Sequence, residues 1–325
     1  MKYRKFGKTG WDVSEIGFGA WAIGGSWGSQ DDGESIKAMH KALDLGVNFI
    51  DTAAGYGNGR SERLIGQILK ERKGEKIYVA TKTPPSDGHW PPLPQERWED
   101  RYSEKYLREN IETRLKNLGV EALDCLQLHT WTRAWNDDPQ PLMLLRKFQK
   151  EGKIRAVGIS TPEHDQNSVI DLMRGGWVDV VQVIYNIFEQ EPAAQLLPVA
   201  KKQNVGIIVR VVFDEGSLTG RFTNETTFEE GDFRRNYFAG DRLSRSVARA
   251  QKVKETIAGS GYTMPQAALK FALANDAVGT IIAGIRNESQ AQMNCSVSEL
   301  PDMTPELQKK LWPHNWRRAF WYSGK

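Results

Sequence analysis

The chain has 325 residues, of which 39% are hydrophobic and 26% are charged, and its formal net charge is +3. Lysines and arginines are scattered, which argues against a nucleic-acid partner, because such a partner needs a basic stripe. No apolar run resembles a signal peptide or reaches the ~18 uncharged residues of a membrane span. The cysteines Cys125 and Cys295 lie far apart, and Cys125 falls in an apolar strand pattern. A reduced thiol and a cytoplasmic location are therefore expected.

Apolar strand-like runs alternate with helix-period segments along nearly the whole chain. Two short extended pieces, at 3–6 and 13–18, come first and predict an N-terminal β-hairpin. The runs that we interpret as barrel or sheet strands are VSEIGFG (13–19), VNFIDTA (47–53), KIYVATK (76–82), ALDCLQLH (122–129), KIRAVGIS (153–160), DVVQVIYN (179–186), VGIIVRVVF (205–213) and VGTIIAG (278–284). Helix patterns follow these runs, and several end at a glycine, as at Gly46 and Gly119.

This alternation indicates a parallel sheet covered by helices, because the strands are apolar on both faces. Eight βα units close naturally into a barrel whose active site lies at the carboxyl ends of the strands. An open doubly wound sheet is the alternative, but IGFGAWAIGG lacks the G-x-G-x-x-G spacing that such a sheet usually shows. We therefore predict an α/β protein that forms a single (β/α)8 TIM barrel domain over residues 1–325.

Three long segments, 83–103, 130–141 and 221–242, would lie at the carboxyl ends of the strands. Loops of this length in a compact domain are more often functional lids than simple connections. The C-terminal tail, WPHNWRRAFWYSGK, carries three tryptophans. Either it packs on the barrel wall or it helps to close a pocket.

Four polar residues stand where apolar runs end: Asp51, Tyr56, Lys82 and His129. Taken alone, Asp51 can cap the next element, His129 can be a satisfied core histidine, and Tyr56 can pack in its small-residue loop. Lys82 is harder to explain in this way, because an unpaired ammonium in the mouth of a barrel is costly to desolvate. Asp51, one strand away, is its obvious partner. The coincidence of all four at neighbouring strand ends favours a catalytic role.

Together these side chains suit proton transfer to a carbonyl oxygen. A free tyrosine has a pKa near ~10, and a neighbouring lysine ammonium is expected to lower the pKa of the Tyr56 phenol. Asp51 keeps Lys82 charged, and His129 can donate a hydrogen bond to a substrate oxygen. Tyr56 would then act as a general acid while hydride reaches the carbon. Since no side chain supplies hydride, a nicotinamide cofactor must do so.

The stretch NFIDTAAGYGNGRSERLIGQIL resembles the Asp-Thr-Ala-x-x-Tyr-Gly-x-Ser-Glu motif of the aldo-keto reductases, and the similarity covers nearly the whole chain. The resemblance implies a (β/α)8 barrel and a cofactor, usually NADPH, bound without a Rossmann domain. It also implies that Asp51, Tyr56, Lys82 and His129 form the catalytic tetrad.

The same resemblance implies residues for the nicotinamide and the pyrophosphate. Ser160 and Gln182 match the pair that binds the carboxamide, although Thr161 replaces the asparagine that commonly follows the serine. Arg210 occupies the place of a tyrosine that stacks on the nicotinamide, and a guanidinium plane can also stack. The loop expected to offer backbone N–H groups to the pyrophosphate contains Gly216, Ser217 and Leu218.

IIAGIRNESQAQMN resembles the family's adenosine-phosphate segment and places Gly284, Arg286, Gln290 and Asn294 at its binding positions. Arg286 would pair with a 2′-phosphate, which favours NADP(H) over NAD(H). Its alternative is a solvated surface arginine. Met293 replaces a common glutamate, so one adenine contact is expected to be missing.

The substrate side of the site is expected to include Trp21, Trp90 and Trp131, from the loops after the first, third and fourth strands. We therefore predict an NADP(H)-dependent oxidoreductase that interconverts a small carbonyl compound and an alcohol. No metal, nucleic-acid or membrane partner is expected, and the sequence does not determine the oligomeric state. One alternative is a non-catalytic regulatory subunit that resembles potassium-channel β subunits. Another is a barrel lyase or hydrolase, although the sequence shows no clear metal-ligand cluster.

Overall fold

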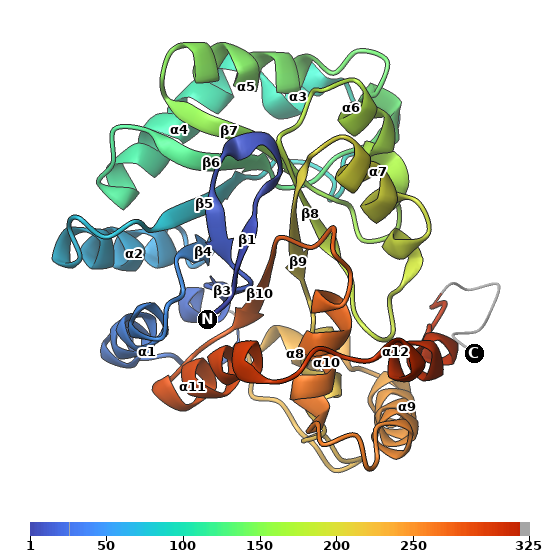
Figure 1. The fold of residues 1–325 in the computed structure, drawn as a ribbon. Helices are drawn as coiled ribbons and strands as arrows, with labels where there is room; N and C mark the ends of the chain where they lie inside the picture. Colours follow the sequence, from blue (N-terminus) through green and yellow to red (C-terminus); the bar gives the residue numbers. More distant parts are fainter. Residues whose placement is uncertain (26, 319–325) are drawn as a thin grey trace.

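The computed structural model describes residues 1–25 and 27–318. Eight parallel strands form a closed barrel in the order β10-β3-β4-β5-β6-β7-β8-β9, with helices around it (Figure 1). The barrel strands are β3 (Ile16–Gly19), β4 (Phe49–Asp51), β5 (Tyr78–Thr83), β6 (Leu123–Leu128), β7 (Ile154–Ser160), β8 (Val180–Ile184), β9 (Gly206–Arg210) and β10 (Thr280–Gly284). The predicted (β/α)8 barrel is confirmed.

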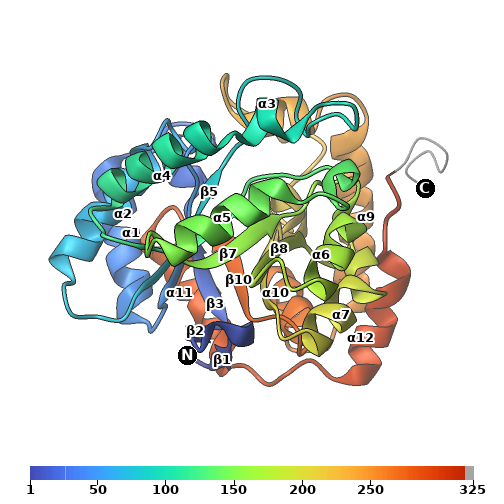
Figure 2. The ribbon, with the colours of Figure 1, turned by 90° about the horizontal axis from the view of Figure 1, so that it is seen from above.

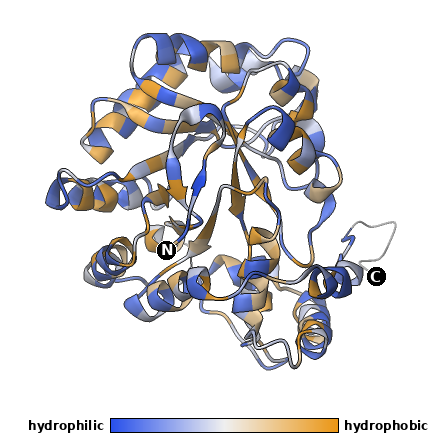
Figure 3. Cartoon of the chain, in the orientation of Figure 1, coloured by the Kyte–Doolittle hydropathy of each residue, from blue (hydrophilic) through white to orange (hydrophobic). Residues whose placement is uncertain are grey.

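The longer helices cover the barrel because they bury an apolar side against it. In α2, for example, Leu64, Ile65 and Ile68 are buried at helical spacing. Figure 3 shows the contrast between the largely hydrophobic strands and the mixed colouring of the surrounding helices. The described helices are α1 (Asp32–Asp44), α2 (Arg60–Glu71), α3 (Trp98–Tyr102), α4 (Glu104–Leu118), α5 (Gln140–Lys150), α6 (Ile170–Arg174), α7 (Leu196–Lys202), α8 (Phe233–Tyr237), α9 (Arg242–Thr256), α10 (Met264–Leu273), α11 (Glu288–Ser296) and α12 (Pro305–Leu311). None of them has the length and apolar character that a membrane crossing requires.

An N-terminal hairpin closes the amino-terminal end of the barrel. Its strands β1 (Tyr3–Lys5) and β2 (Asp12–Ser14) pair antiparallel, as predicted. Phe6, which directly follows β1, is fully buried and packs on Phe49 at the start of β4, with ring centroids 5.4 Å apart. The extended piece predicted at 13–18 is divided between two sheets, because β2 pairs with β1 whereas β3 enters the barrel.

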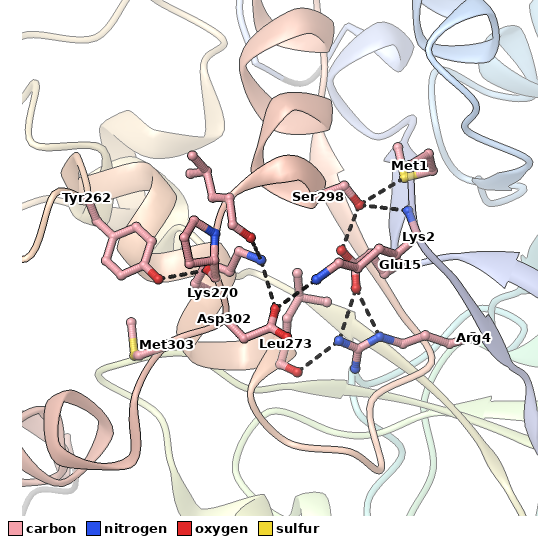
Figure 4. Close-up of polar contacts among 12 residues, drawn as sticks. Met1, Lys2, Arg4, Glu15, Tyr262, Lys270, Leu273, Ser298, Asp302 and Met303 are labelled. Atoms are coloured by element: carbon pink, nitrogen blue, oxygen red, sulfur yellow. Dashed lines mark hydrogen bonds and ion pairs between the residues drawn. The ribbon is translucent and has the colours of Figure 1, made fainter.

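A buried polar cluster joins this hairpin to the segment that follows α11 (Figure 4). The Glu15 carboxylate, only 1% exposed, pairs with Arg4 at 3.0 Å and accepts a hydrogen bond from the Ser298 hydroxyl at 2.6 Å. Nearby, the buried ammonium of Lys270 contacts Asp302 at 3.1 Å. The first and last parts of the barrel are therefore held together at its amino-terminal end.

The long loops lie at the other end of the barrel. Figure 2 shows α3, which belongs to the loop after β5, opposite the hairpin. The predicted long loops contain short helical pieces: α3 in 83–103, a 3-10 turn in 130–141, and α8 in 221–242. The carboxyl ends of the strands and these loops surround a cavity of about 1550 Å³.

Candidate active site

The four predicted catalytic residues come from neighbouring strand ends. Asp51 ends β4, Lys82 lies one residue before the end of β5, and His129 directly follows β6. Tyr56 belongs to the turn after β4. Since β4 pairs with β5 and β5 pairs with β6, the carboxyl ends of these parallel strands bring the side chains to one end of the barrel.

Lys82 connects the carboxylate to the phenol. Its ammonium, fully buried, forms an ion pair with Asp51 and donates hydrogen bonds to the Thr52 carbonyl oxygen at 2.8 Å and the Tyr56 hydroxyl at 3.4 Å. Burial opposes the charge of Lys82, yet Asp51 and Tyr56 raise its pKa above the ordinary value. Lys82 therefore presents a positive charge to the tyrosine oxygen.

Two glutamines hold the other oxygen of the Asp51 carboxylate. The side-chain amides of Gln182, on β8, and Gln127, on β6, donate to Oδ2 at 2.7 and 3.2 Å. Burial raises the pKa of Asp51, whereas Lys82 and the two glutamines act in the opposite direction. The carboxylate is thus fixed from across the barrel interior, and it fixes Lys82 in turn.

The pKa of the Tyr56 phenol differs from the expectation that Lys82 lowers it. Burial raises the pKa of Tyr56 above its ordinary value, and the opposing effect of Lys82 does not overcome it. The phenol therefore keeps its proton at neutral pH. An ordinary phenol is also protonated at neutral pH, and burial reinforces this form, which is the one that a proton donor needs.

His129 lies beside the phenol, with ring centroids 6.0 Å apart. Burial, with Lys82 and Arg210 adding their positive charges, holds the pKa of His129 well below its ordinary value. A neutral imidazole has one N–H donor and one acceptor nitrogen. His129 can therefore donate a hydrogen bond at neutral pH without carrying charge.

Two of the three predicted pocket tryptophans line the cavity. Trp21 stacks near Tyr56, with centroids 6.3 Å apart, and Trp90 contacts His129 edge-on at 5.1 Å. The expectation for Trp131 is wrong. Trp131 is fully buried in the core, where it packs against Trp135 with ring centroids 5.3 Å apart. Its indole N–H donates a hydrogen bond within the same loop.

The predicted nicotinamide residues lie on three adjacent strands, β7, β8 and β9. Ser160 is beside Gln182 in the β7–β8 pair, and Arg210 ends β9. The Gln182 amide group already donates to Asp51. Arg210 donates to the Thr161 carbonyl oxygen at 3.0 Å and pairs with Glu163 at 3.1 Å, while its Nε is buried without a partner in the described chain. An unpartnered donor on the cavity wall fits a ligand there.

The loop after β9 was predicted to offer backbone N–H groups to the pyrophosphate, and its structure differs from this prediction. The backbone N–H groups of Gly216 and Leu218 both donate to the Phe213 carbonyl oxygen at 3.0 Å, and the Ser217 hydroxyl donates to Asp214. These two N–H groups are thus used within the turn and are not offered to a pyrophosphate in this arrangement. Glu215 and Gly216 have positive φ angles of 54° and 105° here.

The adenosine end of the predicted site follows β10. The side-chain oxygen of Gln290 accepts the backbone N–H of Arg286 at 2.8 Å, so Gln290 braces the chain around Arg286. Asn294 donates to the Gly284 carbonyl oxygen at 3.4 Å, and its own Oδ1 is buried without a partner among the described residues. Because Asn294 also lines the cavity, this free acceptor fits an amino group such as that of adenine.

The profile of the aldo/keto reductase family matches residues 15–311. The chain belongs to the aldo/keto reductase family. This is a family of oxidoreductases that bind a nicotinamide cofactor, which agrees with the two unpartnered polar atoms at separate parts of the cavity wall.

Among its relatives, the chain is 36% identical over 241 residues to the aldo-keto reductase YhdN of Bacillus subtilis (strain 168), covering 72% of this chain and 69% of that protein. It is 27% identical over 310 residues to the NADH-specific methylglyoxal reductase of Escherichia coli (strain K12), covering 90% and 92%. The holo structure of the aldo-keto reductase AKR11C1 from Bacillus halodurans superposes with a TM-score of 0.77 at 25% identity, covering 98% of this chain and 97% of that chain.

Several cavity residues of this aldo/keto reductase were not predicted. Trp27 and Phe233 extend the aromatic wall from Trp21, at 5.5 and 4.9 Å respectively. Both belong to segments that the sequence singled out, the tryptophan-containing loop after β3 and the long loop after β9. Arg318, in the C-terminal tail, also lines the cavity and pairs with Asp214 at 2.5 Å. The last tryptophan of that tail, Trp321, lies outside the described residues.

Proposed function

We propose that this chain is an NADP(H)-dependent oxidoreductase that interconverts an aldehyde or ketone and an alcohol, with Tyr56 as the general acid and base. The observation that carries the proposal is the position of the Lys82 ammonium, which contacts both the Asp51 carboxylate and the Tyr56 hydroxyl oxygen. In such a position the ammonium stabilises the phenolate that remains once the proton has left.

Each member of the tetrad has a separate task. When bound, the nicotinamide supplies or accepts hydride at the substrate carbon. Tyr56 delivers its proton to the carbonyl oxygen, Lys82 stabilises the resulting phenolate, and Asp51 keeps Lys82 charged. Neutral His129 donates a hydrogen bond to the same oxygen and holds the carbonyl group next to the phenol. In the oxidative direction Tyr56 takes the proton back.

The cofactor residues that support this proposal are Ser160, Gln182 and Arg210 near the tetrad. Arg286 and Asn294 would hold the adenosine phosphate and the adenine. Trp21 and Trp90 give flat apolar walls beside the reacting group, and such walls accept aromatic compounds and the apolar faces of sugars equally.

The proposal is tested with a panel of aldehydes, ketones and sugars, in which turnover is followed by NADPH absorbance. We expect Tyr56→Phe to lower kcat by ~100–10,000-fold, the range that general acid catalysis supplies. The dissociation constant of the cofactor should be unchanged, because the phenyl ring is kept. Tyr3→Phe, which changes an exposed tyrosine at the opposite end of the barrel, is the matched control.

A regulatory subunit that holds the cofactor without turnover is the second candidate. It uses the same cavity but needs no proton donor. Tight nucleotide binding by the wild type, with no turnover across the panel, would contradict the first proposal and favour this one. Near-normal rates for Tyr56→Phe would remove Tyr56 from its role as acid.

A further inference from the structure

Arg286 differs from three other arginines that line the cavity. Arg210, Arg234 and Arg318 each pair with a carboxylate, from Glu163, Asp232 and Asp214 respectively. Arg286 has no carboxylate partner within 4.0 Å in the described ranges, 1–25 and 27–318. Its positive charge is therefore not cancelled by a direct ion pair.

Two neutral oxygen atoms hold the Arg286 guanidinium instead. Its Nε donates to the side-chain oxygen of Gln30 at 2.7 Å, and its Nη2 donates to the Ser29 carbonyl oxygen at 2.6 Å. These two bonds use one side of the planar guanidinium. Nη1 has no hydrogen bond with any residue that the structure describes, so the end of the group can take a further anionic partner.

Gln30 is itself fixed from several directions. Its amide nitrogen donates to the Arg286 carbonyl oxygen at 3.0 Å and to the Ser35 hydroxyl at 3.1 Å. The backbone carbonyl oxygen of Gln30 accepts a hydrogen bond from the Arg60 guanidinium at 2.6 Å, and Arg60 pairs with Asp32. Gln30 and Arg286 thus hold each other by reciprocal bonds. A side chain fixed in this way loses little conformational freedom when a ligand arrives.

The remaining end of the guanidinium matches a phosphate monoester. Arginine pairs with phosphate through two parallel N–H donors, and such bonds are stronger than neutral ones. Asp232 is near enough for Arg286 to lower the pKa of its carboxyl, but its direct partner is Arg234 at 2.6 Å. The uncancelled charge of Arg286 therefore favours a ligand that carries an additional phosphate.

We propose that Gln30, with the Ser29 carbonyl, is a positioning residue that presents Arg286 to the 2′-phosphate and so sets the preference for NADP(H) over NAD(H). This inference rests on the proposed function, because it takes the cavity to be the dinucleotide site. It adds a residue from the loop after β3, far in sequence from the adenosine-phosphate segment.

The experiment measures dissociation constants of NADP⁺ and NAD⁺ by titration of the intrinsic tryptophan fluorescence, and those of 2′,5′-ADP and 5′-AMP by calorimetry. The wild type should bind NADP⁺ and 2′,5′-ADP more tightly than the partners that lack the 2′-phosphate. Gln30→Ala should weaken NADP⁺ and 2′,5′-ADP by ~5–10-fold, about one hydrogen bond, and leave NAD⁺ and 5′-AMP within ~2-fold. Gln30→Glu should weaken the binding of NADP⁺ and 2′,5′-ADP by ~10–100-fold, because a carboxylate would cancel the charge of Arg286.

An Arg286→Ala background is the matched control, in which Gln30→Ala should have no further effect on any of the four ligands. Thermal unfolding of each variant shows that a change in binding does not reflect loss of the fold. Equal weakening of the ligands with and without the phosphate, or an effect that persists in the Arg286→Ala background, overturns the inference. A wild type that binds none of the four ligands contradicts the proposed carbonyl–alcohol chemistry. Equal affinity for NADP⁺ and NAD⁺ contradicts the role of Gln30 and the preference for NADP(H), and does not affect the proposed role of Tyr56.

Discussion

Tyr56 experiences two opposing effects on the pKa of its phenol. Burial raises the pKa of the phenol, and the Lys82 ammonium lowers it. The same ammonium, together with burial, lowers the pKa of His129. Burial, assisted by this buried cation, therefore keeps the imidazole neutral, and the same cation limits the rise in the phenol pKa. Both groups are hydrogen-bond donors at neutral pH.

The neutral state of His129 predicts how stability depends on pH. The unfolded chain binds a proton at this residue below pH ~6.5, whereas the folded protein does not, so the free energy of unfolding falls as the pH decreases through that value. The slope from His129 is at most ~1.4 kcal/mol per pH unit. Urea unfolding between pH 7.5 and 5.5 should show a shallower loss of stability for His129→Gln than for the wild type. Equal slopes would mean that the pKa of His129 is the same in the folded and unfolded states.

The turn after β9 is an element in which several unfavourable features lie together. Val211, Asp214 and Glu215 all have positive φ angles, of 56°, 49° and 54°. Such angles are uncommon for residues other than glycine and store strain. Burial and the neighbouring charge of Asp214 also raise the pKa of Glu215 to about 8. The turn lines the cavity, so the strain is located where a ligand is expected.

The raised pKa of Glu215 gives a prediction of opposite sign to that for His129. Between the ordinary value for glutamate and about pH 8, the folded protein binds a proton that the unfolded chain has lost, so stability falls as the pH rises. Glu215→Gln should therefore stabilise the protein by ~1–3 kcal/mol at pH 8.5 and by much less at pH 5.0. Urea unfolding at the two pH values measures this difference. The control is Glu225→Gln, an exposed position in the following loop, and a similar gain there would contradict the assignment.

The whole molecule separates its stabilising contacts from its chemistry. The hairpin and the polar cluster around Glu15 and Lys270 lie at the amino-terminal end of the barrel (Figure 4). The tetrad and the aromatic walls lie at the carboxyl end. Substitutions in the cluster are therefore expected to change stability and leave turnover by the folded enzyme unchanged.

Glu15→Gln tests this separation. It removes the charge that pairs with Arg4, so we expect the free energy of unfolding to fall by ~1–3 kcal/mol. Lys5→Gln, in the same hairpin, breaks an exposed pair with Asp12 and should have little effect. Urea unfolding measures both, and kcat should match the wild type in each. Equal stability of the two variants would show that burial of the Glu15 pair is unimportant.

The architecture and the positions of the tetrad could be predicted because they depend on local patterns. Apolar runs define the strands, and polar residues at strand ends must meet once parallel strands close into a barrel. The side to which Trp131 points depends on how its loop packs, which the sequence pattern does not contain. The net pKa of Tyr56 depends on burial in the final fold. The contact between Gln30 and Arg286 joins residues 256 positions apart and has no local signal.

The barrel closes where β10 pairs with β3, its last and first strands. Gln30 follows β3 and Arg286 follows β10, so their contact spans this seam. Arg286 is synthesised 256 residues after Gln30, so Gln30 has no partner at this position until most of the polypeptide has been made. A nucleotide recognised at this seam would therefore bind the closed barrel more tightly and, by mass action, would stabilise it against separation of β10 from β3.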